Sequence, residues 1–161
     1  MASKEICNCA LLRRASRKVT QMYDNELAAV GLRTTQFAIL AEVRRRAGPP
    51  VMGELARALV MDRSTLGHNL RPLEREGLIV FQSMEEDRRN KRVALTAAGE
   101  QRYRDGMPYW RRAQQRFEAA FGAAWSANFR EVTTAISRTD FVRVSLDGEG
   151  APSGTERAGE A

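Results

Sequence analysis

The sequence predicts a mainly α-helical fold of the α+β class, and three observations carry this prediction. Apolar residues recur at helical spacing over most of the chain, two short predicted helices are separated by about three residues, and two β-rich runs flank a charged segment. The chain has 161 residues, of which 43% are hydrophobic. It is therefore long enough for one domain with a packed core.

A long amphipathic helix is predicted for residues 6–30, because one apolar stripe runs along it from Leu11 to Val30 before Gly31 stops it. A second helix is expected to begin at a Thr34 cap and to end at residues 44–46, where three arginines are favourable near a helix C-terminus. The glycine and two prolines of residues 48–50 then break the chain.

The next two helices have the spacing of a helix-turn-helix motif. The first is predicted for residues 52–59, and the second for residues 63–76, with Asp62 as its N-cap. Leu66, Leu70 and Leu73 form one apolar line along the second helix. Because about three residues join the two helices, we expect the second to act as the recognition helix.

A β-hairpin is predicted directly after this motif. Residues 78–81 and 93–95 are its strands, and four cations lie within residues 87–92 at its tip. The position and charge of the hairpin are typical of a wing.

The C-terminal part is predicted to hold two further helices. Thr96 caps the first, which Pro108 should kink or split, and Gly122 separates it from a last helix over residues 124–144. Residues 145–161 are glycine-rich and acidic and are expected to be disordered. Residues 147–161 carry a net charge of −3, so that the chain total of +6 leaves +9 on the other 146 residues.

Basic and hydrogen-bonding side chains lie on the predicted recognition helix, away from its leucines. Such groups donate hydrogen bonds to phosphates or to base edges in the major groove, and an arginine on a wing fits the minor groove. Asp87 is expected to orient Arg89. The predicted DNA contacts are Arg63, Ser64, Thr65, His68, Arg71 and Arg75 on the helix and Arg89 and Lys91 on the wing.

These residues resemble the MarR family of winged helix-turn-helix regulators. The resemblance rests on Gln36-Phe37, on residues 62–74 and 77–79, and on Asp87-x-Arg89 followed by Leu95-Thr96-x-x-Gly99. It covers residues 6–144 and implies a winged lobe over about 34–96 with dimerisation helices over about 6–30 and 97–144. It also implies a homodimer that represses transcription from a pseudo-palindromic operator in double-stranded DNA and is released by a small aromatic ligand or by oxidation.

Dimerisation is also indicated by the residues themselves, because the terminal helices hold both tryptophans and four of the six phenylalanines. A ligand pocket is expected between these helices and the lobe. Its predicted lining is Arg17, Met22, Tyr23, Phe37, Met107 and Trp110.

Cys7 and Cys9 are the candidates for a redox switch; the alternative is that they are small, half-buried packing residues. If both are helical, they point about 160° apart and cannot easily bridge to each other. A disulfide between subunits remains open.

Other function classes are disfavoured by what the sequence lacks. It has no run of 18 apolar residues and no secretory signal, so a cytoplasmic protein that does not enter membranes is expected. A single histidine, two cysteines and no glycine-rich phosphate loop predict neither an enzyme nor a bound metal or cofactor. The remaining alternatives are a non-specific architectural nucleic-acid-binding protein and a protein adaptor.

Overall fold

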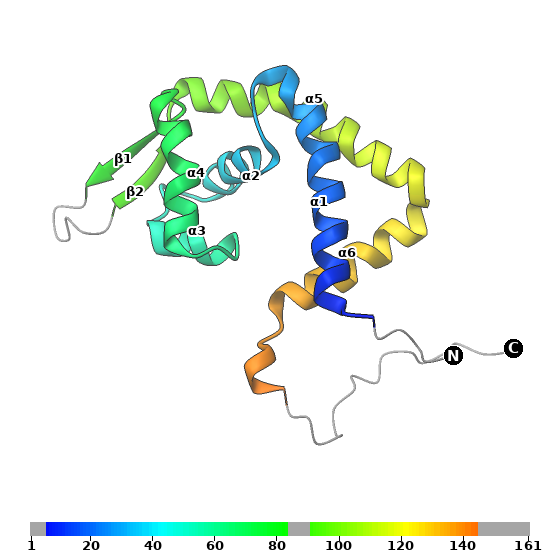
Figure 1. The fold of residues 1–161 in the computed structure, drawn as a ribbon. Coiled ribbons are helices and arrows are strands. Elements are labelled where there is room, and N and C mark those ends of the chain that lie inside the picture. The colour runs from blue at the N-terminus through cyan, green and yellow to red at the C-terminus, as the bar shows by residue number, and fades with distance from the viewer. Residues whose placement is uncertain (1–5, 84–90, 145–161) are drawn as a thin grey trace, which may run out of the picture. The chain divides into compact units, whose positions relative to one another are not determined.

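The computed structural model describes residues 6–83 and 91–144, and it shows a chain of helices with one β-hairpin (Figure 1). Two units are distinguished, residues 1–126 and 127–161, and each is described by itself. The elements are α1 (Asn8–Leu27), η1 (Ala28–Val30), α2 (Thr34–Arg45), α3 (Met52–Ala58), α4 (Arg63–Arg75), β1 (Ile79–Ser83), β2 (Lys91–Leu95), α5 (Ala97–Phe121), α6 (Ala123–Arg138) and η2 (Phe141–Arg143).

The core lies where α2, α3, α4 and the hairpin meet. The apolar line predicted along α4 is buried, since Leu66, Leu70 and Leu73 are all 0% exposed. Leu55 of α3 and Val93 of β2 are buried in the same cluster. Burying a leucine side chain stabilises a fold by roughly 1.5–3 kcal/mol, so this cluster fixes one face of α4.

The hairpin is longer than the sequence predicted. β1 and β2 are antiparallel, with Ile79 opposite Leu95 and Ser83 opposite Lys91. The polar residues Gln82, Ser83 and Lys91 extend the strands beyond the apolar runs, because backbone pairing continues where side chains are exposed. Residues 84–90, including the predicted wing residues Asp87 and Arg89, lie outside the described residues.

Helix α5 packs against α1 and α2, and it runs unbroken through Pro108. Of the two outcomes predicted at Pro108, a kink or a split, the split is therefore wrong. Proline removes the hydrogen bond to the carbonyl four residues earlier, which belongs to Arg104. Because Arg104 and Pro108 are both exposed, water can satisfy that carbonyl.

Two further boundaries differ from prediction. The last helix ends at Arg138 rather than at residue 144, since Asp140 accepts a hydrogen bond from the Val142 N–H and starts a separate turn. At the start of α2 the N-cap position belongs to Arg33 and not to Thr34. The Thr34 N–H and hydroxyl both donate to Asp24 of α1 at 2.7 Å, so Thr34 ties two helices together.

Val60, in the turn between α3 and α4, has a strained backbone. Its φ is +52°, and its side chain is 73% exposed. A β-branched residue in the left-handed region costs roughly 1–2 kcal/mol, and glycine relieves most of this cost. We expect Val60→Gly to raise the free energy of unfolding by about 1 kcal/mol in urea denaturation. The control Val80→Gly, at an exposed strand position, should lower the free energy of unfolding. A change of the same sign and size in both variants would show that the Val60 backbone is not strained.

Candidate nucleic-acid interface and ligand cavity

The N-terminus of α4 is fixed by its cap. Asp62 accepts hydrogen bonds from the Thr65 N–H at 2.8 Å and from the Thr65 hydroxyl at 2.6 Å. The hydroxyl bond and then the backbone bond lower the pKa of Asp62 below its ordinary value. Because the lowered pKa favours the carboxylate in the folded state, the cap stabilises α4 at neutral pH and is lost as the pH falls through that pKa.

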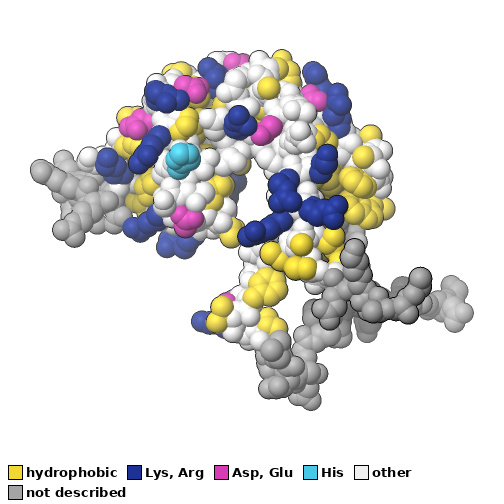
Figure 2. All heavy atoms as spheres, viewed as in Figure 1, with side chains coloured by type: hydrophobic (Ala, Val, Ile, Leu, Met, Phe, Trp, Pro, Cys, Tyr) yellow, Lys and Arg dark blue, Asp and Glu magenta, His cyan; other side chains and the backbone are white. Residues whose placement is uncertain are grey.

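The face of α4 opposite its leucines is open to solvent. Gly67, on this helix, has no atom within 4 Å of where a Cβ would be, so its backbone is open to close approach. Figure 2 shows cationic side chains in dark blue on the face of the lobe that holds α3 and α4. The predicted contacts that α4 exposes are Arg63, Ser64, Thr65, His68, Arg71 and Arg75.

Two neighbouring cations in the described part of the wing differ in their exposure to solvent. Lys91 is exposed, with its Nζ 5.4 Å from the centroid of the Phe81 ring. Arg92 is half-buried and donates to the Pro49 carbonyl at 2.9 Å. Lys91 is thus available to a partner, whereas Arg92 holds the hairpin against the start of α3.

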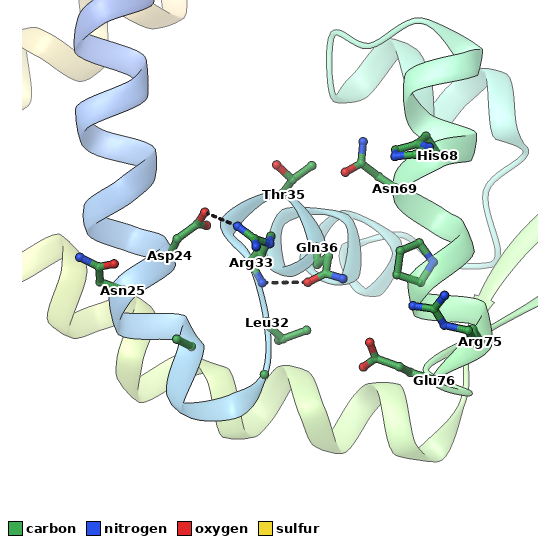
Figure 3. Close-up of a pocket in the computed structure, with 13 residues that line it drawn as sticks. Asp24, Asn25, Leu32, Arg33, Thr35, Gln36, His68, Asn69, Arg75 and Glu76 are labelled. Carbon is green, nitrogen blue, oxygen red and sulfur yellow. Dashed lines mark hydrogen bonds and ion pairs between the residues drawn. The ribbon is translucent and has the colours of Figure 1, made fainter.

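A polar cleft of about 720 Å³ lies beside α4 (Figure 3). One wall is α4 itself, and the other is formed by the end of α1, the turn after η1 and the start of α2. Arg33 is 79% exposed and forms a loose ion pair with Asp24 at 3.6 Å. His68 and Arg75 lie on the opposite wall. Hydrogen-bonding groups therefore face the cleft from both sides.

A second cavity, of about 350 Å³, is mainly aromatic. Phe37 stacks on Tyr103 with ring centroids 5.2 Å apart and on Trp110 at 6.4 Å. Gly106 lets α5 approach this stack, because a Cβ there would be only 2.8 Å from the Phe37 ring. Four of the six residues predicted for a pocket line this cavity, namely Tyr23, Phe37, Met107 and Trp110.

The charged residues of the aromatic cavity are Glu42 and Arg45, and neither Arg17 nor Met22 lines it. Arg17 lines a separate hollow along α1. Glu42 accepts from Arg45 at 2.8 Å and from Arg46 at 2.9 Å. The bond from Arg45 lowers the pKa of Glu42 most, partial burial raises it, and the bond from Arg46 lowers it again, so the carboxylate is favoured.

The fold and the sequence both match known proteins. Residues 32–91 match the MarR family model. The crystal structure of the M. tuberculosis transcriptional regulator MosR in complex with DNA is similar over 86% of this chain and 100% of its own, with 33% identity and a TM-score of 0.75. A second MosR crystal structure has 32% identity and a TM-score of 0.70, over 83% of this chain and 95% of its own.

The chain belongs to the MarR family. The HTH-type transcriptional regulator PecS of Dickeya dadantii (strain 3937) is 32% identical over 90 residues, which are 55% of this chain and 54% of PecS. The match therefore spans about half the length of that curated relative. The predicted winged helix-turn-helix fold is confirmed, with α3 and α4 as its two helices and the hairpin as its wing.

The two cysteines of this MarR-family chain are not placed as predicted. Cys7 precedes α1 in an extended conformation, whereas Cys9 lies in the first helical turn. Both are free and exposed, so neither is a half-buried packing residue. The two side chains are not 160° apart on one helix as predicted, because only Cys9 is helical.

Sequence reasoning missed several residues of these surfaces. Arg57 is exposed on α3, Arg33 lies in the polar cleft, and Arg45 lies at the aromatic cavity. The helical periodicity of the sequence identifies Arg57 and Arg45 only as exposed residues and does not link them to a site. Arg33 reaches the polar cleft because α1 packs against α2, which no local pattern shows. Over residues 6–83 and 91–144, no group of three His, Cys, Asp or Glu side chains is arranged to hold a metal ion. No helix in those ranges is long and apolar enough to cross a membrane.

Proposed function

We propose that this MarR-family protein is a homodimeric repressor that binds a pseudo-palindromic operator in double-stranded DNA and releases it when a small aromatic ligand binds. The observation that carries the proposal is the two-sided character of α4. Its leucines are fully buried, while its opposite face exposes Ser64, His68, Arg71 and Arg75. These groups suit base edges and phosphates in a major groove.

The polar cleft beside the recognition helix offers a position for one strand of the DNA. With α4 in the major groove, a sugar-phosphate strand passes along its flank. Arg33 and Arg75 face the cleft from opposite walls and can each donate to a phosphate. The similarity to MosR, whose crystal structure contains DNA, supports the same partner here. Arg89 and Asp87 stay predicted wing residues.

Exposed apolar side chains support a second copy of the chain as partner. On the N-terminal segment Ile6, Leu11 and Leu12 are 71%, 47% and 43% exposed. At the end of α5 Phe121 is 52% exposed and stacks on Trp125 at 4.5 Å. Aromatic and aliphatic groups left in water favour association, since burying them removes apolar area from water.

Selection of genomic fragments by the purified protein tests this function. We expect the bound fragments to share one motif with two-fold symmetry, because a symmetric dimer presents two copies of α4. Sedimentation should give the mass of a dimer. Fragments without a common motif would indicate an architectural protein, and a monomer in sedimentation would exclude the dimer.

The aromatic cavity is the proposed effector site, since its stacked rings suit a planar ligand. Trp110 lines it, whereas Trp125 lies in the first turn of α6 and stacks on Phe121, so the two tryptophans report different places. We expect aromatic acids such as salicylate and 4-hydroxybenzoate to change the fluorescence of the wild type and of Trp125→Phe but not of Trp110→Phe. An equal change in Trp110→Phe would place the ligand elsewhere.

Redox control is a second candidate, favoured by the exposure of both thiols and by the position of Cys7 outside α1. Two thiols would give a disulfide while peroxide is reduced to two molecules of water. We expect peroxide to weaken operator binding of the wild type, and the Cys7→Ser/Cys9→Ser double variant to keep its affinity. Loss of binding by the double variant under peroxide would eliminate this candidate.

A further inference from the structure

Arg102 of α5 contacts two segments that are far apart in the sequence. Its Nη1 donates to the Val30 carbonyl at 3.2 Å. The same nitrogen lies 3.7 Å from the Glu76 carboxylate. Val30 ends η1, between α1 and α2, whereas Glu76 is the C-cap of the recognition helix α4. One guanidinium therefore joins α5 to both.

These two segments belong to opposite walls of the polar cleft. Gly31, next to Val30, lines one wall, and Glu76 lines the other. Arg102 also lies close to Gly31, with its Nη1 3.5 Å from where a Cβ of that glycine would be. Figure 3 shows α5 passing beneath the turn before α2 and beneath the end of α4 that carries Glu76. Arg102 thus links the two walls of the cleft through Val30 and Glu76, although it does not itself line the cleft.

One flank of α4 faces the polar cleft through His68, Asn69, Pro72 and Arg75. Leu66, Leu70 and Leu73 hold the other flank in the core, but about 720 Å³ of open space separates α4 from the start of α2. The Arg102 side chain is 34% exposed and that of Glu76 is 39% exposed. The contact between Arg102 and Glu76 is partly shielded from water and lies at the C-terminus of α4, whereas the Asp62 cap holds the N-terminus. Because the two ends are held separately, the contact can restrict rotation of α4 toward the cleft.

We infer that Arg102 is a positioning residue that fixes the angle between the recognition helix and α5, and thereby the half-site separation that a dimer accepts. This inference rests on the proposed function. Two recognition helices bind half-sites at the distance and rotation that the dimer imposes. One added base pair rotates a half-site by roughly 34° and moves it by about 3.4 Å, so the penalty for a changed separation measures how firmly the helices are held.

The experiment measures the affinity of the full chain for the selected operator and for versions whose half-sites are one or two base pairs closer or farther apart. Arg102→Ala removes the contact, Arg102→Lys keeps the charge, and Glu76→Gln weakens the same contact from the other side. Arg104→Ala is the matched control, since Arg104 is on the same helix and its partners among the described residues are on α5, namely Gln101 at 2.9 Å and Glu100 at 3.8 Å. Melting temperatures of all variants are recorded.

We expect the wild type and Arg104→Ala to show the same penalty for a one-base-pair change. Arg102→Ala should reduce that penalty by about threefold or more, and Glu76→Gln in the same direction, because the helices become freer to rotate. The penalty measured for Arg102→Lys should lie between those of the wild type and Arg102→Ala. The salt dependence of binding should not change, since Arg102 is not placed on a phosphate.

Two results would overturn the inference while leaving the proposed function intact. One is that the affinity of Arg102→Ala depends on half-site separation in the same way as that of the wild type. The other is an equal loss of affinity at every separation, as general destabilisation would give. If Arg102→Ala does not fold, the profiles of Glu76→Gln and Arg102→Lys decide. A wild type without any preferred separation would instead contradict the proposed dimer and, with it, the inference.

Discussion

Replacing Gly99 with alanine is expected to lower the free energy of unfolding by about 3 kcal/mol, at the upper end of what overpacking a well-packed site costs. A Cβ at this position would overlap the Leu78 carbonyl oxygen, which belongs to the backbone and cannot rotate away. The same carbonyl accepts the Thr96 N–H at 3.1 Å. The Gly99 N–H donates to the Thr96 hydroxyl, which in turn donates to the Gly77 carbonyl at 2.7 Å.

Urea denaturation of the wild type and Gly99→Ala measures this effect. Gly67→Ala is the matched control, because nothing lies within 4 Å of a Cβ at Gly67 and alanine favours a helix. That control should gain roughly 0.5–1 kcal/mol. Similar stabilities for Gly99→Ala and the wild type would show that α5 does not approach the Leu78 backbone, just before β1, as closely as described.

Replacing Arg71 with alanine is expected to lower operator affinity by about 100-fold. Arg71 lies on the exposed face of α4, and a lost arginine contact to a base or phosphate costs roughly 1–3 kcal/mol. A dimer loses this contact twice, once in each half-site. The loss should come without a change in melting temperature, since Arg71 is exposed and the leucines beneath it are untouched.

Fluorescence anisotropy with a labelled operator at two salt concentrations measures this change. Arg111→Ala is the control, because it also removes an exposed cation, but from α5 and outside the winged lobe. A reduced salt dependence would assign Arg71 to a phosphate, whereas relaxed discrimination at one base pair would assign it to that base. An affinity within about twofold of the wild type would remove Arg71 from the interface.

The recognition helix was predictable because local rules decide it. Asp62 caps α4 and the line of leucines is buried, both as spacing alone indicates. The cap of α5 was predictable for the same reason, since Thr96 accepts from the Gly99 N–H three residues later. Periodicity and capping depend on neighbours in the sequence, and these elements contain both signals.

The cavities were predictable only in part. An apolar stripe identifies Tyr23, Phe37 and Trp110 as inward-facing residues, and they do meet around one cavity. The charged residues there are Glu42 and Arg45 rather than Arg17, because the packing of α2 against α5, and not any local pattern, brings this part of α2 to the cavity. The contact of Arg102 with Val30 joins residues 72 apart in sequence, so no periodicity reports it.

A footprint of the protein on a selected operator fragment tests the central claim most directly. With α4 of each protomer in a major groove, guanine methylation and hydroxyl-radical probing should show two protected segments related by a two-fold axis. Their centres should lie about 10 base pairs, or a multiple of this, apart. Arg71→Ala should remove both at once. Continuous protection without a register, or protection that Arg71→Ala leaves unchanged, would contradict recognition of DNA through α4.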